Sequence, residues 1–227
     1  MPNVRSPATL TAARAGSYFQ EMDLFPVGLN FAGKSALVVG GGPVALRKIR
    51  ALLRCGAKVV LVAPEVRPEL RKLAAASRII WRKRVYRAAG GLLGAAQNRP
   101  AMVFACTDSE DVNDRVARDA ESAGIWVNRA DCPAASEVHV PSVARLGSLI
   151  LAIFSGGQAP VFAKHLRKRL ERHLGRSVAV ELKVLSEFRR RLRDRVEGPA
   201  RRKRILTRLV EDGTLETIAQ CPAAERR

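Results

Sequence analysis

Residues Leu37–Lys48 read LVVGGGPVALRK, an apolar run that breaks into three consecutive glycines and then becomes basic. The apolar run, from Ser35 to Val39, is typical of a buried strand. After the glycines, apolar residues recur at the spacing of a helix, namely Val44, Ala45, Ile49, Leu52 and Leu53. The sequence thus predicts a strand, a glycine turn and a helix. The glycine turn either binds a nucleotide, as the start of a βαβ unit, or is an ordinary tight turn.

The glycines fit the dinucleotide pattern Gly-x-Gly-x-x-Gly/Ala at Gly40, Gly42 and Ala45. In this pattern the first glycine allows the tight turn, the second lets a pyrophosphate approach the backbone, and the small third residue keeps the helix close to the strand. The helix then presents free N–H groups and its positive end to the phosphates. The cofactor-binding residues predicted from this stretch are Gly40, Gly41, Gly42, Pro43 and Val44.

Strands and helices continue to alternate after this unit, which predicts an α/β fold with a doubly wound, Rossmann-type parallel sheet. The expected strands are 58–62, 79–81, 102–106 and 125–128, with helices at 68–76 and 112–123. After Asp131 the pattern changes to two strands, 138–143 and 149–154, joined by a turn near Gly147. From Pro160 onward the apolar spacing is helical.

The acidic residue that usually ends the second strand of a dinucleotide-binding unit is missing. Val62, Ala63 and Pro64 stand there instead, and Glu65 follows. We therefore expect the backbone around Pro64 and Glu65 to hold the ribose hydroxyls. No arginine occupies the strand end, although Arg67 is near, so these residues leave the choice between NAD and NADP open.

The formal net charge of the 227-residue chain is +19, which implies an acidic partner such as a nucleic acid, an anionic membrane surface or a polyanionic small molecule. Residues 164–208 contain 17 lysines and arginines against 5 acidic residues, so the excess is concentrated toward the C-terminus. No stretch approaches the roughly 18 apolar residues of a membrane span. We expect a protein without a membrane partner.

The four cysteines lie far apart and form no Cys-x-x-Cys or Cys/His cluster, so no metal ligands are predicted. Cysteines without such spacing are typical of free thiols in a reducing compartment, which predicts a cytoplasmic protein. The cysteines are Cys55, Cys106, Cys132 and Cys221.

Five stretches in this order resemble the siroheme synthase N-terminal family, which contains precorrin-2 dehydrogenases and sirohydrochlorin ferrochelatases. The resemblance covers about residues 22–175. The stretches are VGGGPVALRK (39–48), ACTD (105–108), VNRAD (127–131), PSVAR (141–145) and FSGGQAP (154–160).

This resemblance implies an NAD-dependent oxidation of precorrin-2 to sirohydrochlorin, on the way to siroheme or a related tetrapyrrole. Some family members also insert ferrous iron and others do not, so ferrous iron is a further candidate partner. The family has a Rossmann domain, a small dimerisation region and a helical C-terminal domain, which implies a homodimer. The expected regions are a disordered extension (1–21), the Rossmann domain (22–134), the dimerisation region (135–160) and the helical domain (161–227).

The resemblance also implies roles for single residues. The family's essential aspartate falls on Asp131, where a carboxylate is a candidate base for the proton lost in the oxidation; its other interpretation is a cap of the next turn. Thr107 joins the cofactor-binding residues, with Pro64 and Glu65. Ser155 matches a serine near the family's tetrapyrrole site, although a loop hydroxyl is an equal interpretation and the preceding Phe154 departs from the family's pattern.

Three basic residues complete the substrate-binding candidates. Arg145 and Lys164 lie close in sequence to the family's site, and such cations would attract a tetrapyrrole with many carboxylates. His139, in the expected strand 138–143, is a candidate contact for substrate or iron, or a structural histidine. Most other cations, including Arg189–Arg191 and Arg201–Arg204, are expected to form a solvated helix face.

Two other functions stay open at this point. One is a nucleic-acid-binding protein that uses the basic C-terminal helices, which the lack of a recognition motif and of interleaved aromatic residues disfavours. The other is an NAD-dependent dehydrogenase of a different acidic metabolite, which would ignore precorrin-2.

Overall fold

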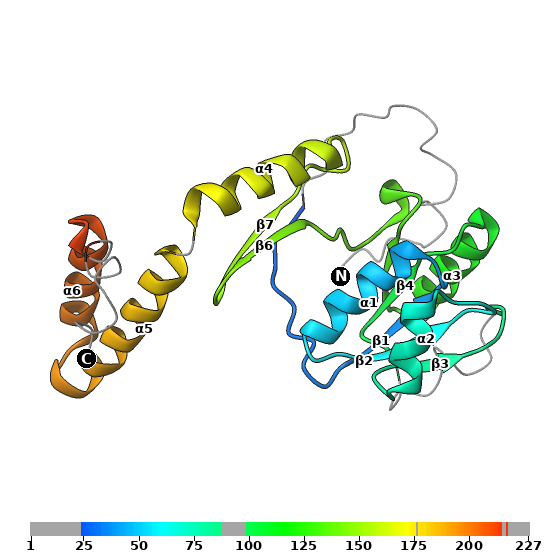
Figure 1. Ribbon diagram of the computed structural model, residues 1–227, viewed down its shortest axis with the longest axis horizontal. Coiled ribbons are helices and arrows are strands. Elements are labelled where there is room, and N and C mark those ends of the chain that lie inside the picture. The colour runs from blue at the N-terminus through cyan, green and yellow to red at the C-terminus, as the bar shows by residue number, and fades with distance from the viewer. Residues whose placement is uncertain (1–23, 88–98, 176, 215–216, 218–227) are drawn as a thin grey trace, which may run out of the picture. The chain divides into compact units, whose positions relative to one another are not determined.

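The computed structural model of the chain describes residues 24–87, 99–175, 177–214 and 217 (Figure 1). The chain divides into two compact units between Val140 and Pro141. The expected extension, residues 1–21, lies outside the described residues, as does Cys221.

The unit before Pro141 is built on a five-stranded parallel sheet with the strand order β3-β2-β1-β4-β5. This confirms the expected Rossmann-type fold. In the described residues a helix follows the first, second and fourth strands, and the predicted strands and helices of this unit begin and end close to the observed ones, whereas the 3-10 turn after the fifth strand was not predicted. The elements are β1 (Ser35–Val39), α1 (Pro43–Arg54), β2 (Lys58–Val62), α2 (Pro68–Ala75), β3 (Ile80–Arg82), β4 (Met102–Ala105), α3 (Glu110–Ser122), β5 (Trp126–Arg129) and the 3-10 turn η3 (Pro133–Ala135).

The sheet is stable because apolar side chains cover both of its faces. Each strand in the middle of a parallel sheet is buried on two sides, which explains why β1 and β4 read as continuous apolar runs. One core contains Val38 and Phe104 with residues of α1, and the other contains Leu37 and Val103 with residues of α3.

The register places the carboxyl ends of three strands side by side. Val39, the last residue of β1, pairs with Val62 of β2 on one side and with Ala105 of β4 on the other. The strand order reverses between β1 and β4, and open α/β sheets bind their ligands outside the carboxyl ends at such a point. The glycines after Val39 therefore lie where this fold binds its ligands.

The unit after Val140 contains an antiparallel strand pair and three helices, as expected. α4 packs on the strand pair, and α5 packs on α6 (Figure 1). Ala144 of the first strand and Ala163 of α4 are 1% and 4% exposed. The elements are β6 (Ser142–Leu146), β7 (Leu149–Ile153), α4 (Pro160–Leu174), α5 (Ser177–Arg195) and α6 (Pro199–Glu211).

One predicted strand is placed wrongly. We expected 138–143, with His139 inside it, whereas β6 begins at Ser142 and His139 lies in no strand. The preceding segment is held against β5 instead, because the N–H groups of Glu137 and Val138 both donate to Val127 O, at 3.1 and 3.2 Å. Pro141, which has no N–H to donate, then precedes the first paired residue.

Candidate active site

Gly40 ends β1 in a conformation that a side chain would disturb. Its φ is +117°, and a Cβ atom on it would overlap the carbonyl group of Cys106. Its N–H donates to Val62 O at 2.9 Å. Glycine here lets the ends of β1, β2 and β4 meet closely.

Gly41 is needed for a second close approach. A Cβ atom on Gly41 would overlap the carbonyl oxygen of Glu65, and the N–H of Arg67 donates to Gly41 O at 3.1 Å. The loop after β2 is thus seated directly on the glycine turn. This contact explains a glycine that the motif itself does not require.

Gly42 has the opposite surroundings. Apart from its two chain neighbours, no heavy atom of the described residues lies within 4 Å of the position that its Cβ would take, so this side of the backbone is open. Gly42 is the N-cap of α1, and Pro43, which has no N–H, is the first residue of the helix. The first N–H groups of a helix have no partner within it. An open backbone beside a helix N-terminus suits a phosphate group.

These loops enclose one cavity of about 690 Å³ at the carboxyl ends of β1, β2 and β4. All eight residues predicted to bind the cofactor line it, and its size and open glycine wall fit a dinucleotide. The predicted lining residues are Gly40, Gly41, Gly42, Pro43, Val44, Pro64, Glu65 and Thr107.

Several residues of the cavity wall were not predicted. The cavity is also lined by Tyr86 and by residues near Thr107 in the sequence, namely Cys106, Asp108, Ser109 and Val112. The Tyr86 hydroxyl donates to Asp119 Oδ2 at 2.9 Å, and burial, with that carboxylate, raises the pKa of Tyr86 above its usual value. Tyr86 follows β3 in a segment without a motif, so the sequence offers no signal for it.

Asn113 holds the loop that carries Thr107. The Thr107 hydroxyl donates to Asn113 Oδ1 at 2.8 Å, the Thr107 N–H donates to the same oxygen at 3.1 Å, and Asn113 Nδ2 donates to Thr107 O at 3.1 Å. Asn113 is only 1% exposed. It shares a helical stripe with Val116 and Ala120, and a polar residue on a buried stripe is the signal that could have identified it.

Asp131 lies just beyond β5, and both of its carboxylate oxygens face Arg129. Arg129 Nη2 donates to Oδ2 at 2.8 Å and Nε to Oδ1 at 3.3 Å. Arg129 also forms an ion pair with Asp114 of α3, and its own side chain is 6% exposed. Burial raises the pKa of Asp131, but hydrogen bonds from Arg129 and Asn113 outweigh it and hold that pKa below its usual value. The carboxylate is therefore ionised at neutral pH.

Lys48 forms a second polar cluster, on the α1 face of the sheet. Its Nζ donates to Asn128 Oδ1 at 2.8 Å and lies 5.6 Å from the centre of the Phe104 ring. Asn128 Nδ2 donates to Val138 O at 2.8 Å. Lys48 was predicted only as part of the basic helix. Its spacing from Ala45, Ile49 and Leu52, which are buried, could have placed it on the inner face of α1.

The substrate-binding candidates are divided between the two units. His139 and Asp131 belong to the unit before Pro141, whereas Arg145, Ser155 and Lys164 belong to the other. Arg145 on β6 is exposed while its neighbour Ala144 is buried, so these two side chains point to opposite faces of the strand pair.

Ser155 and Lys164 lie on neighbouring elements of the second unit. Ser155 lies in the loop between β7 and α4, where its carbonyl oxygen accepts the N–H of Gln158 at 2.9 Å. Lys164 is exposed on α4. The substrate-binding roles of both residues stay predictions.

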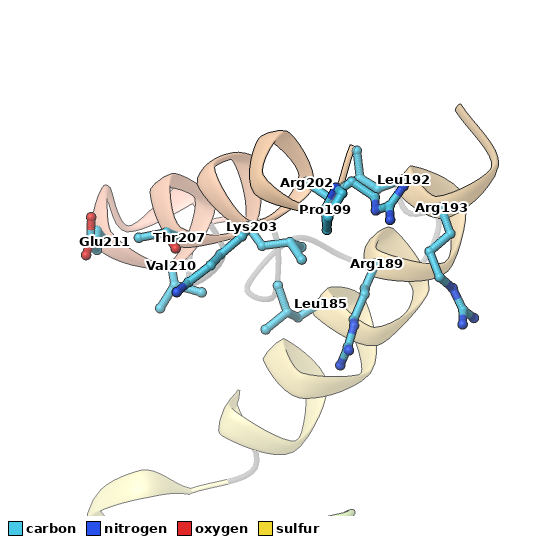
Figure 2. Close-up of a pocket in the computed structure, with 11 residues that line it drawn as sticks. Leu185, Arg189, Leu192, Arg193, Pro199, Arg202, Lys203, Thr207, Val210 and Glu211 are labelled. Atoms are coloured by element: carbon cyan, nitrogen blue, oxygen red, sulfur yellow. The ribbon is translucent and has the colours of Figure 1, made fainter. Parts of the chain in front are cut away.

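A groove of about 630 Å³ runs between α5 and α6 (Figure 2). Leucine and valine side chains from both helices line it, together with Arg189 and Arg193 from α5 and Arg202 and Lys203 from α6. Arg202 Nη1 donates to Val196 O at 2.9 Å, which ties it to the turn between the helices. The lining residues that the structure describes include no aromatic side chain on which a base could stack.

Neither a metal site nor a membrane span is found in the described parts of the chain. No group of three or more His, Cys, Asp or Glu residues there could hold a metal ion, and no helix there is long and apolar enough to cross a bilayer. The three described cysteines, Cys55, Cys106 and Cys132, form no disulfide.

Comparison with known proteins agrees with this geometry. Residues 27–142 match a family described as "Putative NAD(P)-binding". A siroheme synthase of Ectopseudomonas mendocina is 39% identical over 78% of this chain and 36% of its own length. A siroheme synthase of Tolumonas auensis is 33% identical over 88% of this chain and 41% of its own. The resemblance seen in the sequence is thus confirmed, and the chain spans about two fifths of the length of these curated relatives.

One solved structure resembles both units of the chain. SirC, a precorrin-2 dehydrogenase, matches with a TM-score of 0.71 and 25% sequence identity. The match covers 85% of this chain and 92% of that one.

Proposed function

The chain belongs to the family described as "Putative NAD(P)-binding", and from this premise we propose that it is an NAD-dependent dehydrogenase that oxidises precorrin-2 to sirohydrochlorin. The observation that carries the proposal is an ionised carboxylate, Asp131, just beyond β5, whose last residue, Arg129, pairs with Ala105 next to Cys106 in the wall of the dinucleotide cavity. The similarity to siroheme synthases and to a precorrin-2 dehydrogenase supports this choice of substrate.

The residues at the end of β2 favour NAD over NADP. Glu65 is the first charged residue after the strand, and a carboxylate suits a ribose hydroxyl better than a 2′-phosphate. Arg67, the first cation that follows the strand in the sequence, is 3.5 Å from Glu69 in an ion pair. The loop itself is held by Trp81, whose Nε1 donates to Ala63 O at 3.0 Å.

The chain's own residues supply binding and proton transfer. Bound NAD would accept a hydride from a carbon of the substrate. Gly42 and the first turn of α1 would hold the pyrophosphate of NAD. Thr107, which is hydrogen-bonded to Asn113, would contact another part of the bound NAD. Asp131 takes the proton that the substrate loses in the same oxidation, and Arg129 holds its two oxygens in place for that transfer.

The second unit would contribute the contacts to a substrate with many carboxylates. Arg145, Lys164 and Ser155 are the candidates there, and His139 is the candidate in the first unit. Cations attract such a substrate and orient it through charge-assisted hydrogen bonds. A cytoplasmic location belongs to the same proposal, supported by the absence of a disulfide among the described cysteines.

The strand pair β6–β7 would join two copies of the chain. Among the described residues these strands pair only with each other, so each has an open edge. Ile150 of β7 is 53% exposed and Phe162 of α4 is 62% exposed. A two-stranded sheet with apolar residues in water is marginal by itself. Light scattering after size exclusion should give a dimer, and Ile150→Lys should give a monomer.

The function is tested by adding enzymatically generated precorrin-2 and NAD under anaerobic conditions and recording the sirohydrochlorin spectrum. Formation of sirohydrochlorin that depends on NAD supports the proposal, and a later addition of ferrous iron shows whether iron is inserted. No turnover by a protein that binds NAD would overturn it in favour of another acidic metabolite. Salt-dependent DNA binding without any effect of NAD would favour the nucleic-acid alternative.

A further inference from the structure

The ammonium group of Lys48 is part-buried against the sheet, and its printed partners carry no negative charge. Its hydrogen-bond acceptor, Asn128 Oδ1, is an uncharged amide oxygen, and its other neighbour is the ring of Phe104. Among the residues that the structure describes, no carboxylate lies within 4.0 Å of Nζ. A desolvated charge without a counter-ion is costly, so its presence here calls for a role.

The charged groups around Lys48 come from two elements. Arg47 is its exposed neighbour on α1, and Cys106 follows β4. Burial lowers the pKa of Lys48 to about 8. Cys106 acts to raise this pKa, and the positive charge of Arg47 acts to lower it. Burial raises the pKa of Cys106 to about 11, so the thiol stays neutral at ordinary pH. Lys48 is therefore mainly cationic at pH 7 and mainly neutral above pH 9.

Cys106 links Lys48 to the cofactor cavity. It lines the cavity beside Thr107, and its side chain lies in the same core as the ring of Phe104, two residues earlier, which the Lys48 ammonium group faces. In this fold the pyrophosphate lies at the glycine turn and one ribose lies over the end of the second strand. The nicotinamide half of the dinucleotide is then expected to lie against the remaining part of the cavity, lined by Cys106, Thr107 and Ser109.

We propose that the Lys48 ammonium group makes the bound nicotinamide a stronger hydride acceptor by disfavouring its cationic, oxidised form relative to its neutral, reduced form. In the reaction a carbon–hydrogen bond of the substrate breaks and its electron pair and hydrogen move to the nicotinamide, whose charge falls from +1 to zero. The proton that is also lost goes to Asp131. Repulsion from a part-buried cation is relieved by this transfer. The inference rests on the proposed function for the direction of the hydride transfer.

The test compares the affinities of NAD and NADH in the absence of substrate. We would titrate NADH by its fluorescence and NAD by competition, at pH 7, for the wild type and for Lys48→Met, Lys48→Arg and Arg47→Met. The ratio Kd(NAD)/Kd(NADH) should fall by about tenfold in Lys48→Met and recover in Lys48→Arg. Arg47→Met removes the same charge from the exposed neighbour, where water screens it, and should change the ratio by less than about twofold.

A pH series of the wild type tests the same inference, with Lys48→Met as its control. In the wild type the ratio should fall between pH 7 and 9.5 as Lys48 loses its proton, and in Lys48→Met it should stay constant. The proposal is overturned by an unchanged ratio in a folded Lys48→Met protein, by an equal shift in Arg47→Met, or by a flat wild-type series. Both ligands bind without precorrin-2, so a failure to oxidise precorrin-2 would be seen separately.

Discussion

The two sides of the candidate site are built in opposite ways. On the glycine side the backbones of Gly40 and Gly41 approach neighbouring loops so closely that no side chain fits. On the other side, charged and polar groups hold the ends of β4 and β5: Arg129 and Asn113 are buried, and Lys48 is part-buried. A larger side chain at a glycine would disrupt the first side, whereas a substitution that removes a charged or polar group would disrupt the second. Sequence motifs describe the first kind of site better than the second.

The largest loss of stability is expected from Arg129→Met. Arg129 is almost fully buried and bonds two carboxylates, so its removal leaves Asp131 and Asp114 without their partner. The free energy of unfolding should fall by about 3 kcal/mol. Urea unfolding would measure it, with Arg118→Met as the control because Arg118 is exposed on α3, the helix that carries Asp114. Equal stability of the two variants would show that the charged side is not what holds the site.

Lys48 should make the protein more stable at alkaline pH. Its folded pKa, about 8, lies below the ordinary 10.5, so the unfolded chain binds more protons between these values and stability rises with pH there. Relative to Lys48→Met, the wild type should gain about 2 kcal/mol from pH 7.5 to 10.5. Unfolding in urea across this range measures the difference between the two proteins. A constant difference would mean that Lys48 is not desolvated.

The glycine side is tested by a matched pair of substitutions. Gly41→Ala would overlap the Glu65 carbonyl and should cost about 2 kcal/mol of stability, whereas Gly42→Ala meets no atom and should change stability by less than about 0.5 kcal/mol. Gly42→Ala should still weaken NAD binding at least about tenfold, because its methyl group occupies the space of the pyrophosphate. Calorimetry and NAD titration separate the two effects. NAD binding by Gly42→Ala at wild-type strength would contradict this location of the cofactor.

The smallest effect concerns acid stability. The folded pKa of Asp131 is lowered, so its stabilisation is complete above the ordinary pKa near 3.8 and is lost as the pH falls through the folded value. The wild type should exceed Asp131→Asn in stability by a constant amount, under about 1 kcal/mol for this part-exposed group, above pH 5. Below pH 4 the difference should shrink. A gap that is unchanged at pH 3 would show that Arg129 does not hold the ionised carboxylate.

The strands and the glycine turn could be predicted because their signals are local. The continuous apolar runs at 35–39 and 58–62 agree with β1 and β2 residue for residue. The start of β6 was predicted too early, because the backbone of 137–138 is bound to Val127 across the fold. No local pattern contains that contact.

The buried polar groups could not be predicted from local patterns. Lys48 and Asn128 are 80 residues apart and meet because α1 places Lys48 over Phe104, which pairs with Asn128 across β4 and β5. Arg129 meets Asp114 because α3 packs on β5. The spacing of Lys48 and Asn113 on the inner faces of α1 and α3 was visible, but their partners were not.

The central claim is that Asp131 acts in the oxidation and not in cofactor binding. The most direct measurement compares wild type with Asp131→Asn, by NAD affinity and by the anaerobic rate of sirohydrochlorin formation from precorrin-2. The account predicts NAD affinity within about twofold of wild type and a rate lowered by at least about 100-fold, since an amide cannot accept the proton. A rate equal to that of wild type would contradict it.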